Sequence, residues 1–594
     1  FGIDPERQVP YARLRRLRRV KVLRASGRRL SRVEVRYDPG AIVRGLSARA
    51  VLPSGEIRKA EQGIQDIVQA DGVAAKALRI SDVEVGTIIE HTYDLYADDL
   101  RFLPPWRFSG PFPTIRAEYV VSVPANFEID LRFSENGQFV DRPPERFELD
   151  GATRYSWTLS NLPPQFTEDG MPAPELLAPR AHVLFKKATL PQRTVSGFDS
   201  WDAVARWQQQ RIPGWTALSD ATVREARRIA GEGSPSEKAL KLAEVLARDF
   251  KNGPTSDIPL WRAPAEHPDR VFAAKTSNPT TRGMLLVALL RAIGIEADPA
   301  LFAYRDRDAL IPDAPLVRAL DGVAAIVSQS DGPMIIDPNQ ATLSAQVPSP
   351  RLQGTRIVAV RNDGAEVMRV PRSTADQSRC DIDFRTKWTA KDGVFGTVDV
   401  RLTGAEAGAL RADLLAASAG DYAAIVGRFL HSRGFALPIE SISIADLRAL
   451  HRPLSLKGRV ASTDAIRVEA SQLLIRTGAF IGWPSTPVRQ TRRTPLLLGP
   501  ARQVRVRGSL SMPEGHAPQI LPPAAEHTYD GVHVQWAARK ENDRRIGFAR
   551  SERWTKPSIP RSRYERFAAF LEAVMDGEEQ AISVARPTER PLEF

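Results

Sequence analysis

The spacing of apolar residues changes near residue 200 and again near residue 376, and these changes divide the chain into three regions. In residues 11–190, apolar side chains alternate with basic or polar ones, as at Val33 and Val35. A period of two is typical of half-buried strands, and the Pro, Gly and Asp residues between these segments indicate turns. We therefore predict an N-terminal antiparallel β-sandwich domain over residues 1–195.

The middle of the chain has helical periodicity. A helix is expected from Trp201 to Gln210, and Ser234 with Glu237 forms a capping box at the start of another. The segment from Pro279 to Ile293 is apolar on nearly every face, which predicts a buried helix capped by the residue before Pro279. Short apolar strands follow it. These elements predict a central α+β domain over residues 196–375.

Strand-like alternation returns in the last third of the chain, for example at Cys380, Ile382 and Phe384. An Ala- and Leu-rich stretch, residues 404–433, interrupts the strands and predicts a helical insertion. We therefore expect a C-terminal, mainly β domain with helical segments over residues 376–594. A chain of 594 residues has room for three domains of this size, which makes the whole a multi-domain α+β protein.

The single cysteine, Cys380, excludes an intrachain disulfide and any metal site built from several thiolates. The eight histidines form no metal-binding spacing, and no phosphate-binding loop or dinucleotide fingerprint is present, so we expect no metal and no cofactor. No apolar run approaches the roughly 18 residues that cross a bilayer, so no transmembrane segment is expected in this chain. The first residue is Phe1, as expected of a chain whose signal peptide has been removed.

The formal net charge is +12, from 83 basic and 71 acidic residues. Positive charge favours anionic partners, but here it is spread over a long chain. Eleven basic residues gather near the N-terminus: Arg13, Arg15, Arg16, Arg18, Arg19, Lys21, Arg24, Arg28, Arg29, Arg32 and Arg36. Such a run either contacts an anionic lipid, glycan or nucleic acid, or forms the solvent-facing side of an edge hairpin. Nucleic acid is the least expected partner, because no nucleic-acid-binding fold is recognisable.

Several short motifs follow one another in a characteristic order. They are Tyr37-Asp38-Pro39, Ala48 and Ala50 before Leu52-Pro53-Ser54-Gly55, Val85 to Glu90, Val123-Pro124, Trp157 with Asn161, Glu168 with Pro172, and Leu285 to Ile295. On these motifs the chain resembles exported bacterial proteins that join an N-terminal β-domain of unknown function to a transglutaminase-like (papain-like) core and a C-terminal β-region. The resemblance implies the same three-part fold and a periplasmic or secreted location.

An active core of that superfamily needs a cysteine at a helix N-terminus, a histidine on a nearby strand, and an Asp or Asn that orients the histidine. The resemblance assigns these positions to Pro279, Gly322 and Asp337. Pro279 has no thiol and Gly322 has no imidazole, while Asp337 fits a turn at the end of a strand. The resemblance therefore implies vestigial triad positions in a catalytically inactive core.

The alternative to an inactive core is an enzyme whose nucleophile lies at another position in the chain. Cys380 shares a strand face with apolar neighbours, which favours a buried structural cysteine. A hydroxyl near the predicted helix start needs a base, and His267 precedes that helix in the sequence. The candidate hydroxyls are those of Ser277, Thr280 and Thr281.

The first hypothesis is a pseudoenzyme of the bacterial cell envelope that acts as a binding or scaffolding module. Its expected partner is a cell-envelope protein, peptide or glycan, which the vestigial cleft would hold in extended form. The alternative hypothesis is an active cysteine or threonine amidase, protease or acyltransferase. It requires a displaced nucleophile within hydrogen-bond reach of a histidine.

Overall fold

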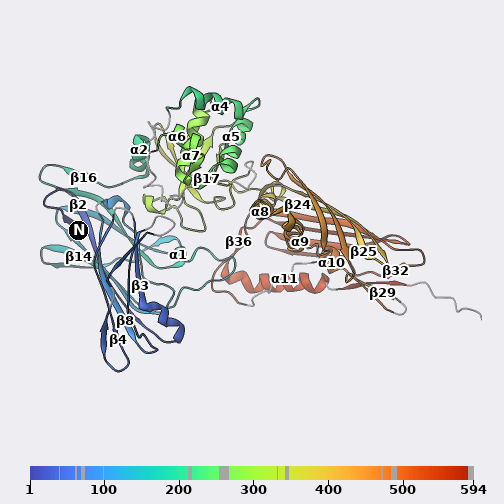
Figure 1. Cartoon of the computed structure of the whole chain (residues 1–594), viewed down its shortest axis with the longest axis horizontal. Helices are drawn as coiled ribbons and strands as arrows, with labels where there is room; N and C mark the ends of the chain where they lie inside the picture. Colours follow the sequence, from blue (N-terminus) through green and yellow to red (C-terminus); the bar gives the residue numbers. More distant parts are fainter. Residues whose placement is uncertain are drawn as a thin grey trace, which may run out of the picture.

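The computed structural model describes residues 1–38, 41–60, 63–68, 74–97, 99–211, 217–252, 266–330, 332–340, 347–469, 472–482, 491–578 and 580–585. The chain is a multi-domain, mainly β protein whose sheets are largely antiparallel. In Figure 1 the N-terminal β region lies at the left, the helix-rich central region at the top and the C-terminal β region at the right. Pro39, part of one quoted motif, lies outside the described residues.

The first half of the N-terminal region packs two sheets around one core. A five-stranded sheet has the order β1-β2-β8-β4-β5 and a three-stranded sheet the order β3-β7-β6. Val33 and Val35 point into their shared core, as the alternation predicts. The strands are β1 (Gly2–Ile3), β2 (Pro10–Lys21), β3 (Arg32–Tyr37), β4 (Ile42–Val51), β5 (Ile57–Lys59), β6 (Gln65–Val68), β7 (Ala74–Arg79) and β8 (Ile88–Ala97).

The second half of this region has its own core, which includes Phe133, Trp157 and Phe185. Residues 1–195 therefore hold two packed units where one sandwich was predicted, because alternation identifies strands but not how distant strands group. The sheets are β10-β14-β13 and β12-β11-β15-β16. Their strands are β10 (Thr114–Pro124), β11 (Phe127–Glu135), β12 (Gln138–Val140), β13 (Glu145–Leu149), β14 (Ala152–Leu162), β15 (Arg180–Thr189) and β16 (Thr194–Ser196), with β9 (Trp106–Arg107) beside β15.

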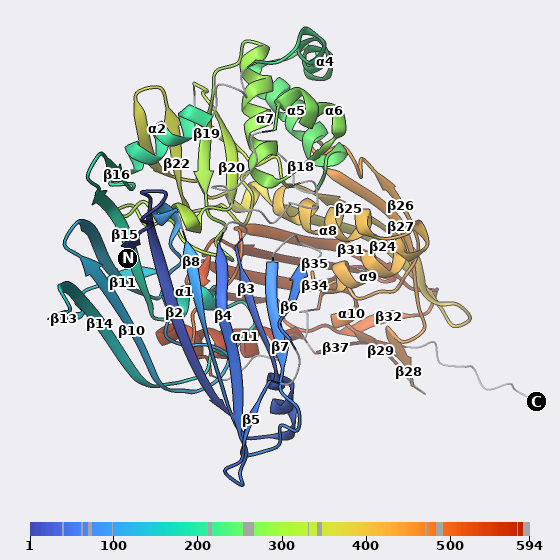
Figure 2. The same cartoon turned by 60° about the vertical axis from the view of Figure 1, so that its left-hand side comes forward.

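The central region places helices against a five-stranded antiparallel sheet of order β21-β20-β19-β22-β23 (Figure 2). The predicted helices at Trp201 and at the Ser234–Glu237 capping box are confirmed, and the apolar segment forms a buried helix from Pro279. The helices are α2 (Trp201–Arg211), α4 (Asp220–Ala230), α5 (Pro235–Asp249), α6 (Pro268–Ala274) and α7 (Pro279–Ala292). The strands are β17 (Lys251–Asn252), β18 (Thr276–Ser277), β19 (Ala297–Phe302), β20 (Gly322–Val327), β21 (Met334–Ile336), β22 (Arg356–Arg361) and β23 (Gly364–Arg369).

Helix α7 approaches β20 unusually closely at Gly283. A Cβ at Gly283 would lie 1.8 Å from the carbonyl oxygen of Val323, so only glycine fits there. Gly283 is one helical turn after Pro279, and Val323 follows Gly322 in β20. The missing side chain therefore sets the spacing between the start of the helix and the start of the strand.

The C-terminal region is built on an eight-stranded sheet of order β26-β27-β25-β24-β31-β35-β34-β33, in which only the β24–β31 pair is parallel. Cys380, Ile382 and Phe384 share its buried face, as predicted. The strands are β24 (Arg379–Thr389), β25 (Gly393–Leu402), β26 (Ile439–Ala445), β27 (Leu454–Ser462), β31 (Arg502–Ser511), β33 (Ala525–Tyr529), β34 (Val532–Asn542) and β35 (Arg545–Trp554). A smaller sheet contains β28 (Ile466–Val468), β29 (Gln472–Arg476), β37 (Ala581–Ala585) and β32 (Ala517–Ile520).

The helical insertion predicted over residues 404–433 is two helices, α8 (Gly404–Ala416) and α9 (Tyr422–His431). Ala417 turns to an extended conformation after α8, and the short polar segment that follows contains a 3-10 turn before α9. Both helices pack on the sheet through Leu410 and Leu430. The last helix, α11 (Tyr564–Glu578), contacts β33. Figure 1 shows α11 along the lower side of the C-terminal region.

A buried ion pair joins the N-terminal and central regions. The Arg180 guanidinium on β15, 2% exposed, donates to both carboxylate oxygens of Asp308 at 3.1–3.2 Å. Removing one partner of such a pair leaves an uncompensated charge, which typically costs more than the pair contributes. We therefore expect Asp308→Asn to lower the free energy of unfolding by about 3 kcal/mol in chemical denaturation. The double variant R180M/D308N should recover most of this loss, and a double variant less stable than D308N would contradict the account.

His182 on β15 should make stability depend on pH. Burial, reinforced by Arg180, lowers the pKa of His182 to about 3, and the ring is 2.8 Å from the Ser134 hydroxyl. The unfolded histidine takes up a proton near 6.5, so between 6.5 and about 3 the unfolded state binds more protons and stability falls as the pH falls. The slope is up to about 1.4 kcal/mol per pH unit. Denaturation curves across this range should show a shallower slope for His182→Gln; equal slopes would contradict the prediction.

Candidate functional site

Asn278 caps the N-terminus of α7, as predicted, and forms a capping box with Thr281. The Asn278 side-chain oxygen accepts from the Thr281 backbone N–H at 2.9 Å, and the Thr281 hydroxyl oxygen accepts from the Asn278 N–H at 3.0 Å. Pro279 occupies the first helical position, where a backbone N–H is not needed. Arg282, one turn on, donates to the Ser277 hydroxyl and to the Phe250 carbonyl at 2.9 and 3.0 Å, which ties the preceding strands to the helix.

Gly322 lies directly against this helix start. A Cβ built on Gly322 would be 3.4 Å from the Cβ of Pro279 and 3.0 Å from the Phe302 ring. Phe302 is the cross-strand neighbour of Gly322 and is fully buried. The structure thus brings the first two predicted positions together and fills the space beside Gly322 with an aromatic ring.

Asp337 completes the group at the end of β21. Its carboxylate accepts from the Tyr304 hydroxyl at 2.8 Å and from the backbone and side-chain N–H of Asn339 at 3.0 and 2.9 Å. The Asn339 amide also donates to the Pro279 carbonyl at 3.2 Å. Asp337 is therefore a turn residue, as expected, and through Asn339 it is also bonded to the start of α7.

Burial favours the neutral forms of the Asp337 and Tyr304 side chains. Burial raises the pKa of the Asp337 carboxyl, although Asn339 and Tyr304 donate to it. Burial, together with Asp337, also raises the pKa of Tyr304, which keeps the phenol protonated as a donor. Tyr304 thus occupies the acceptor that an orienting aspartate would offer to a histidine in an active triad.

A small cavity lies beside Asp337 in the described part of the chain. This cavity is lined by α5, β21 and a loop of the C-terminal region. Its volume of about 20 Å³ is enough for roughly one water molecule. Its lining includes Glu244, Asp337, Gln340, Ser349 and Leu450. Among the described residues this cavity is too small for a peptide or a sugar ring.

Three hydroxyl groups near the start of α7 are the alternative nucleophiles, those of Ser277, Thr280 and Thr281. Thr281 takes part in the capping box and Ser277 accepts from Arg282, while the Thr280 hydroxyl is buried without a hydrogen-bond partner among the described residues. His267 caps α6, where its ring nitrogen Nδ1 accepts from the Asp269 N–H at 3.4 Å. No hydrogen bond between His267 and these hydroxyls occurs in the described part of the chain.

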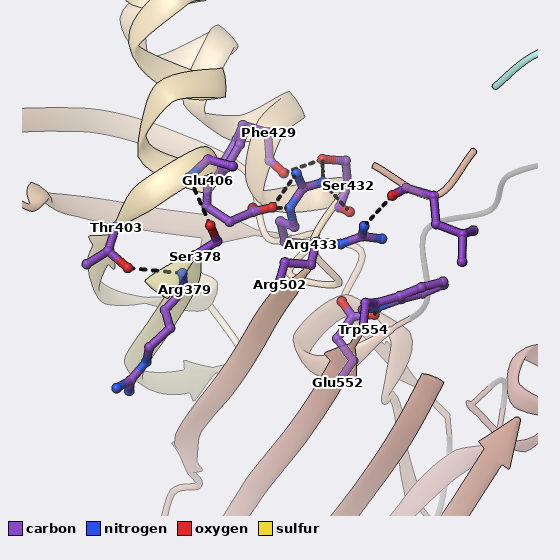
Figure 3. Close-up of polar contacts among 12 residues, drawn as sticks. Ser378, Arg379, Thr403, Glu406, Phe429, Ser432, Arg433, Arg502, Glu552 and Trp554 are labelled. Atoms are coloured by element: carbon purple, nitrogen blue, oxygen red, sulfur yellow. Dashed lines mark hydrogen bonds and ion pairs between the residues drawn. The ribbon is translucent and has the colours of Figure 1, made fainter. Parts of the chain in front are cut away.

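Cys380 lies in the C-terminal region, in the core of the large sheet, and is fully buried. Burial, with the nearby Glu406 carboxylate, raises the pKa of its thiol well above the usual range. Figure 3 shows the ionic network of this neighbourhood, in which Arg433 donates to Glu406 at 2.6 Å and Trp554 donates to Glu552 at 2.8 Å. A thiol with a raised pKa is mostly protonated at neutral pH, and only the thiolate is a nucleophile.

The residues that close the site were not predicted from the sequence. Phe302, Tyr304 and Asn339 carry no motif, and their roles follow from strand pairing and from the turn after β21. The alternation of β19 could have placed Phe302 on a strand, but not opposite Gly322.

In the described residues no group of three or more His, Cys, Asp or Glu side chains is arranged to hold a metal ion. Across the same residues, no helix has the length and apolar character needed to span a membrane.

Residues 13–166 match the DUF3857 family, described as a domain of unknown function with a solved structure. The N-terminal β-domain of unknown function implied by the resemblance is therefore confirmed. The fold of the whole chain is similar to a crystal structure from Parabacteroides distasonis ATCC 8503, described as that of a candidate protease. The TM-score is 0.65 at 12% identity, with 97% of this chain and 96% of the other covered, so the likeness concerns the fold alone. No curated protein matches the chain.

The raised pKa of Asp337 gives a test of the site by stability. The folded carboxyl holds its proton more tightly than the unfolded one, whose pKa is 3.8, so the contribution of Asp337 declines as the pH rises. Asp337→Asn mimics the protonated form and should be at least as stable as the wild type at neutral pH. Asp337→Leu leaves Tyr304 and Asn339 unpaired and should lose about 2 kcal/mol. Thermal denaturation showing equal losses for both variants would contradict this assignment.

The burial of Cys380 predicts a thiol that reagents cannot reach in the folded protein. A disulfide reagent should label no thiol in native buffer and one thiol per chain after denaturation, because only the thiolate reacts. Rapid labelling of the native protein, absent from Cys380→Ser, would show an accessible cysteine and contradict the prediction.

Proposed function

We propose that the central region is a catalytically silent transglutaminase-like core that acts as a scaffold for the two β-rich regions around it. The contact between Pro279 and Gly322, with Phe302 over the glycine, carries the proposal. A thiolate and an imidazole would have to occupy this contact in an active core, and both are absent. The hydrogen-bonded Asp337 and the small size of the cavity beside it support loss of chemistry with retention of the arrangement.

The scaffolding role is supported by polar contacts between the central region and both neighbours. Asp308 pairs with Arg180 of the N-terminal region, and Arg318 pairs with Asp38 of the same region at 2.5 Å. On the other side, Glu244 of α5 lies 3.0 Å from His451 of the C-terminal region.

The two β regions also contact each other directly. Glu168 accepts from the Thr494 hydroxyl at 2.6 Å and from its backbone N–H at 3.1 Å. Buried or part-buried polar contacts fix orientation because each depends on geometry. The three regions are therefore held in one arrangement, as a scaffold requires.

The cellular setting of the proposal follows from the sequence resemblance: a periplasmic or secreted protein of the bacterial cell envelope. Its partner would be an envelope protein, peptide or glycan. Because the cavity beside Asp337 holds about one water, we place this partner on the surface of the β regions and not in the vestigial cleft.

An active amidase, protease or acyltransferase with a displaced nucleophile is the competing function. Cys380 is fully buried with a raised thiol pKa, and His267 caps α6, so no observation favours it. A direct assay separates the two hypotheses: the purified chain is incubated with amide, peptide and amine-acceptor substrates. We expect no turnover, and turnover that disappears in Cys380→Ala or Thr280→Ala would refute the silent core.

The scaffold is tested by binding to isolated cell-wall glycan and to envelope-protein fractions, measured by co-sedimentation. The variant D38N/D308N removes the carboxylate from each of the two ion pairs described above between the N-terminal and central regions. Asp392→Asn, on an exposed turn between β24 and β25, is its control. We expect the wild type and D392N to bind alike and D38N/D308N to bind less while circular dichroism remains unchanged. Equal binding by all three proteins, or by none, would contradict a scaffold.

A further inference from the structure

Strand β2 carries much of the N-terminal basic run. The arginines on its outer face form ion pairs, whereas those on its inner face form none within the described part of the chain. On the outer face Arg13 and Arg15 pair with Asp94 at 2.6 and 3.1 Å. On the same face Arg19 and Arg49 pair with Glu90 at 2.5 and 2.8 Å. Arg13, Arg15 and Arg19 thus lie on an ion-paired, solvent-facing sheet surface, which is one of the two predictions made for the basic run.

The inner face of β2 carries Arg16 and Arg18, and their cross-strand neighbours on β8 are Tyr93 and His91. Arg16 donates to the Tyr93 hydroxyl at 3.5 Å. Arg18 forms no hydrogen bond and no ion pair with any residue the structure describes. Both arginines are partly buried. Cationic groups therefore gather on this face without a carboxylate partner among the described residues.

The charges around this cluster act against the cationic forms. Burial and the neighbouring Arg16 lower the pKa of Arg18, and only the Tyr93 phenol opposes them. Burial, followed by Arg18 and Arg16, lowers the pKa of His91 to about 4. Uncompensated like charges at partly buried positions destabilise a fold unless a ligand neutralises them.

The cluster lies where the two packed units of the N-terminal region meet. Tyr93 belongs to the core of the first unit, whereas Trp106, whose ring lies 5.2 Å from the Arg16 guanidinium, packs on the core of the second. Trp106 stacks on Tyr119 with ring centroids 5.2 Å apart, and its buried indole N–H has no hydrogen-bond partner among the described residues. Hydrogen-bond donors thus outnumber acceptors at this junction.

We propose that Arg16 and Arg18, with the Tyr93 hydroxyl beside them, form a binding site for a phosphate group, either free or on a lipid headgroup. Residues two apart on one strand face are about 7 Å apart, a spacing from which two guanidinium groups can converge on one oxyanion. Guanidinium groups bind phosphate through paired, charge-assisted hydrogen bonds, and a phosphate has enough oxygens to satisfy several donors. The site is independent of the central region and of its proposed role.

The experiment is a titration of the full chain with inorganic phosphate at constant ionic strength, followed by calorimetry. Arg18→Gln removes the unpaired guanidinium and keeps a polar side chain of similar reach. Arg15→Gln is the matched control, because Arg15 lies on the same strand but on the ion-paired outer face. We expect saturable binding by the wild type and R15Q, and an affinity at least about tenfold weaker in R18Q.

Thermal denaturation supplies a second readout that a merely structural arginine would not give. Without phosphate, R18Q should melt above the wild type because like-charge repulsion is relieved. With phosphate, the wild type should gain stability and R18Q should gain almost none. A wild-type affinity in R18Q, or no saturable binding by the wild type to phosphate or to vesicles, would overturn the proposal.

Vesicles containing phosphatidylglycerol identify the source of the phosphate group. Binding to vesicles that free phosphate displaces, and that R18Q loses, supports a lipid headgroup. Binding of free phosphate without binding to vesicles supports a soluble phosphate compound.

Discussion

The close packing of α7 on β20 is the constraint on which the rest of the central region depends. Gly283 admits the Val323 carbonyl to a position that any Cβ would block, and this brings Pro279 against Gly322. The same packing buries the apolar helix on nearly every side, so its position is set by the whole core. A site at the start of this helix is rigid, which suits a catalytic group and equally suits a structural joint.

Around Pro279, Gly322 and Asp337, the neighbouring residues satisfy the polar groups and fill the space. Tyr304 donates to the aspartate, Asn339 connects it to α7, and Phe302 covers the glycine. Each contact removes an unpaired polar group or a void that would otherwise cost stability. The same principle applies between regions, where Asp308 pairs with Arg180 of the N-terminal region and Glu244 contacts His451 of the C-terminal region. The inner face of β2 is the exception, since Arg18 lacks such a partner among the described residues.

Much of the local structure could be predicted from periodicity and capping. The helix that starts at Pro279, the capping box at Ser234 and the buried face of Cys380 all follow from short-range patterns. The grouping of strands into sheets could not be predicted in this way, because pairing such as that of β2 with β8 depends on contacts between distant segments. For this reason the structure has two packed units where one sandwich was predicted. The break between α8 and α9 was missed because only five residues, 417–421, separate the helices, and two of them are alanines that fit a helical composition.

For the site, the sequence resemblance named three positions and the structure brings them together. It did not reveal which residues surround these positions, since Phe302, Tyr304 and Asn339 act through tertiary contacts. The two halves of the basic run were likewise indistinguishable in sequence. Only strand direction shows that Arg15 meets Asp94 while Arg18 faces inward.

The central claim is that Pro279 and Gly322 stand face to face as the positions of a lost thiol and imidazole. The most direct test is disulfide formation in the double variant P279C/G322C. Their Cβ atoms would lie 3.4 Å apart, close to the range of about 3.5–4.5 Å that disulfides use. The account predicts a rapid intramolecular bond on mild oxidation, seen by mass spectrometry as the loss of two hydrogens and absent from either single variant. A double variant that keeps both thiols reduced and reactive under the same conditions would contradict it.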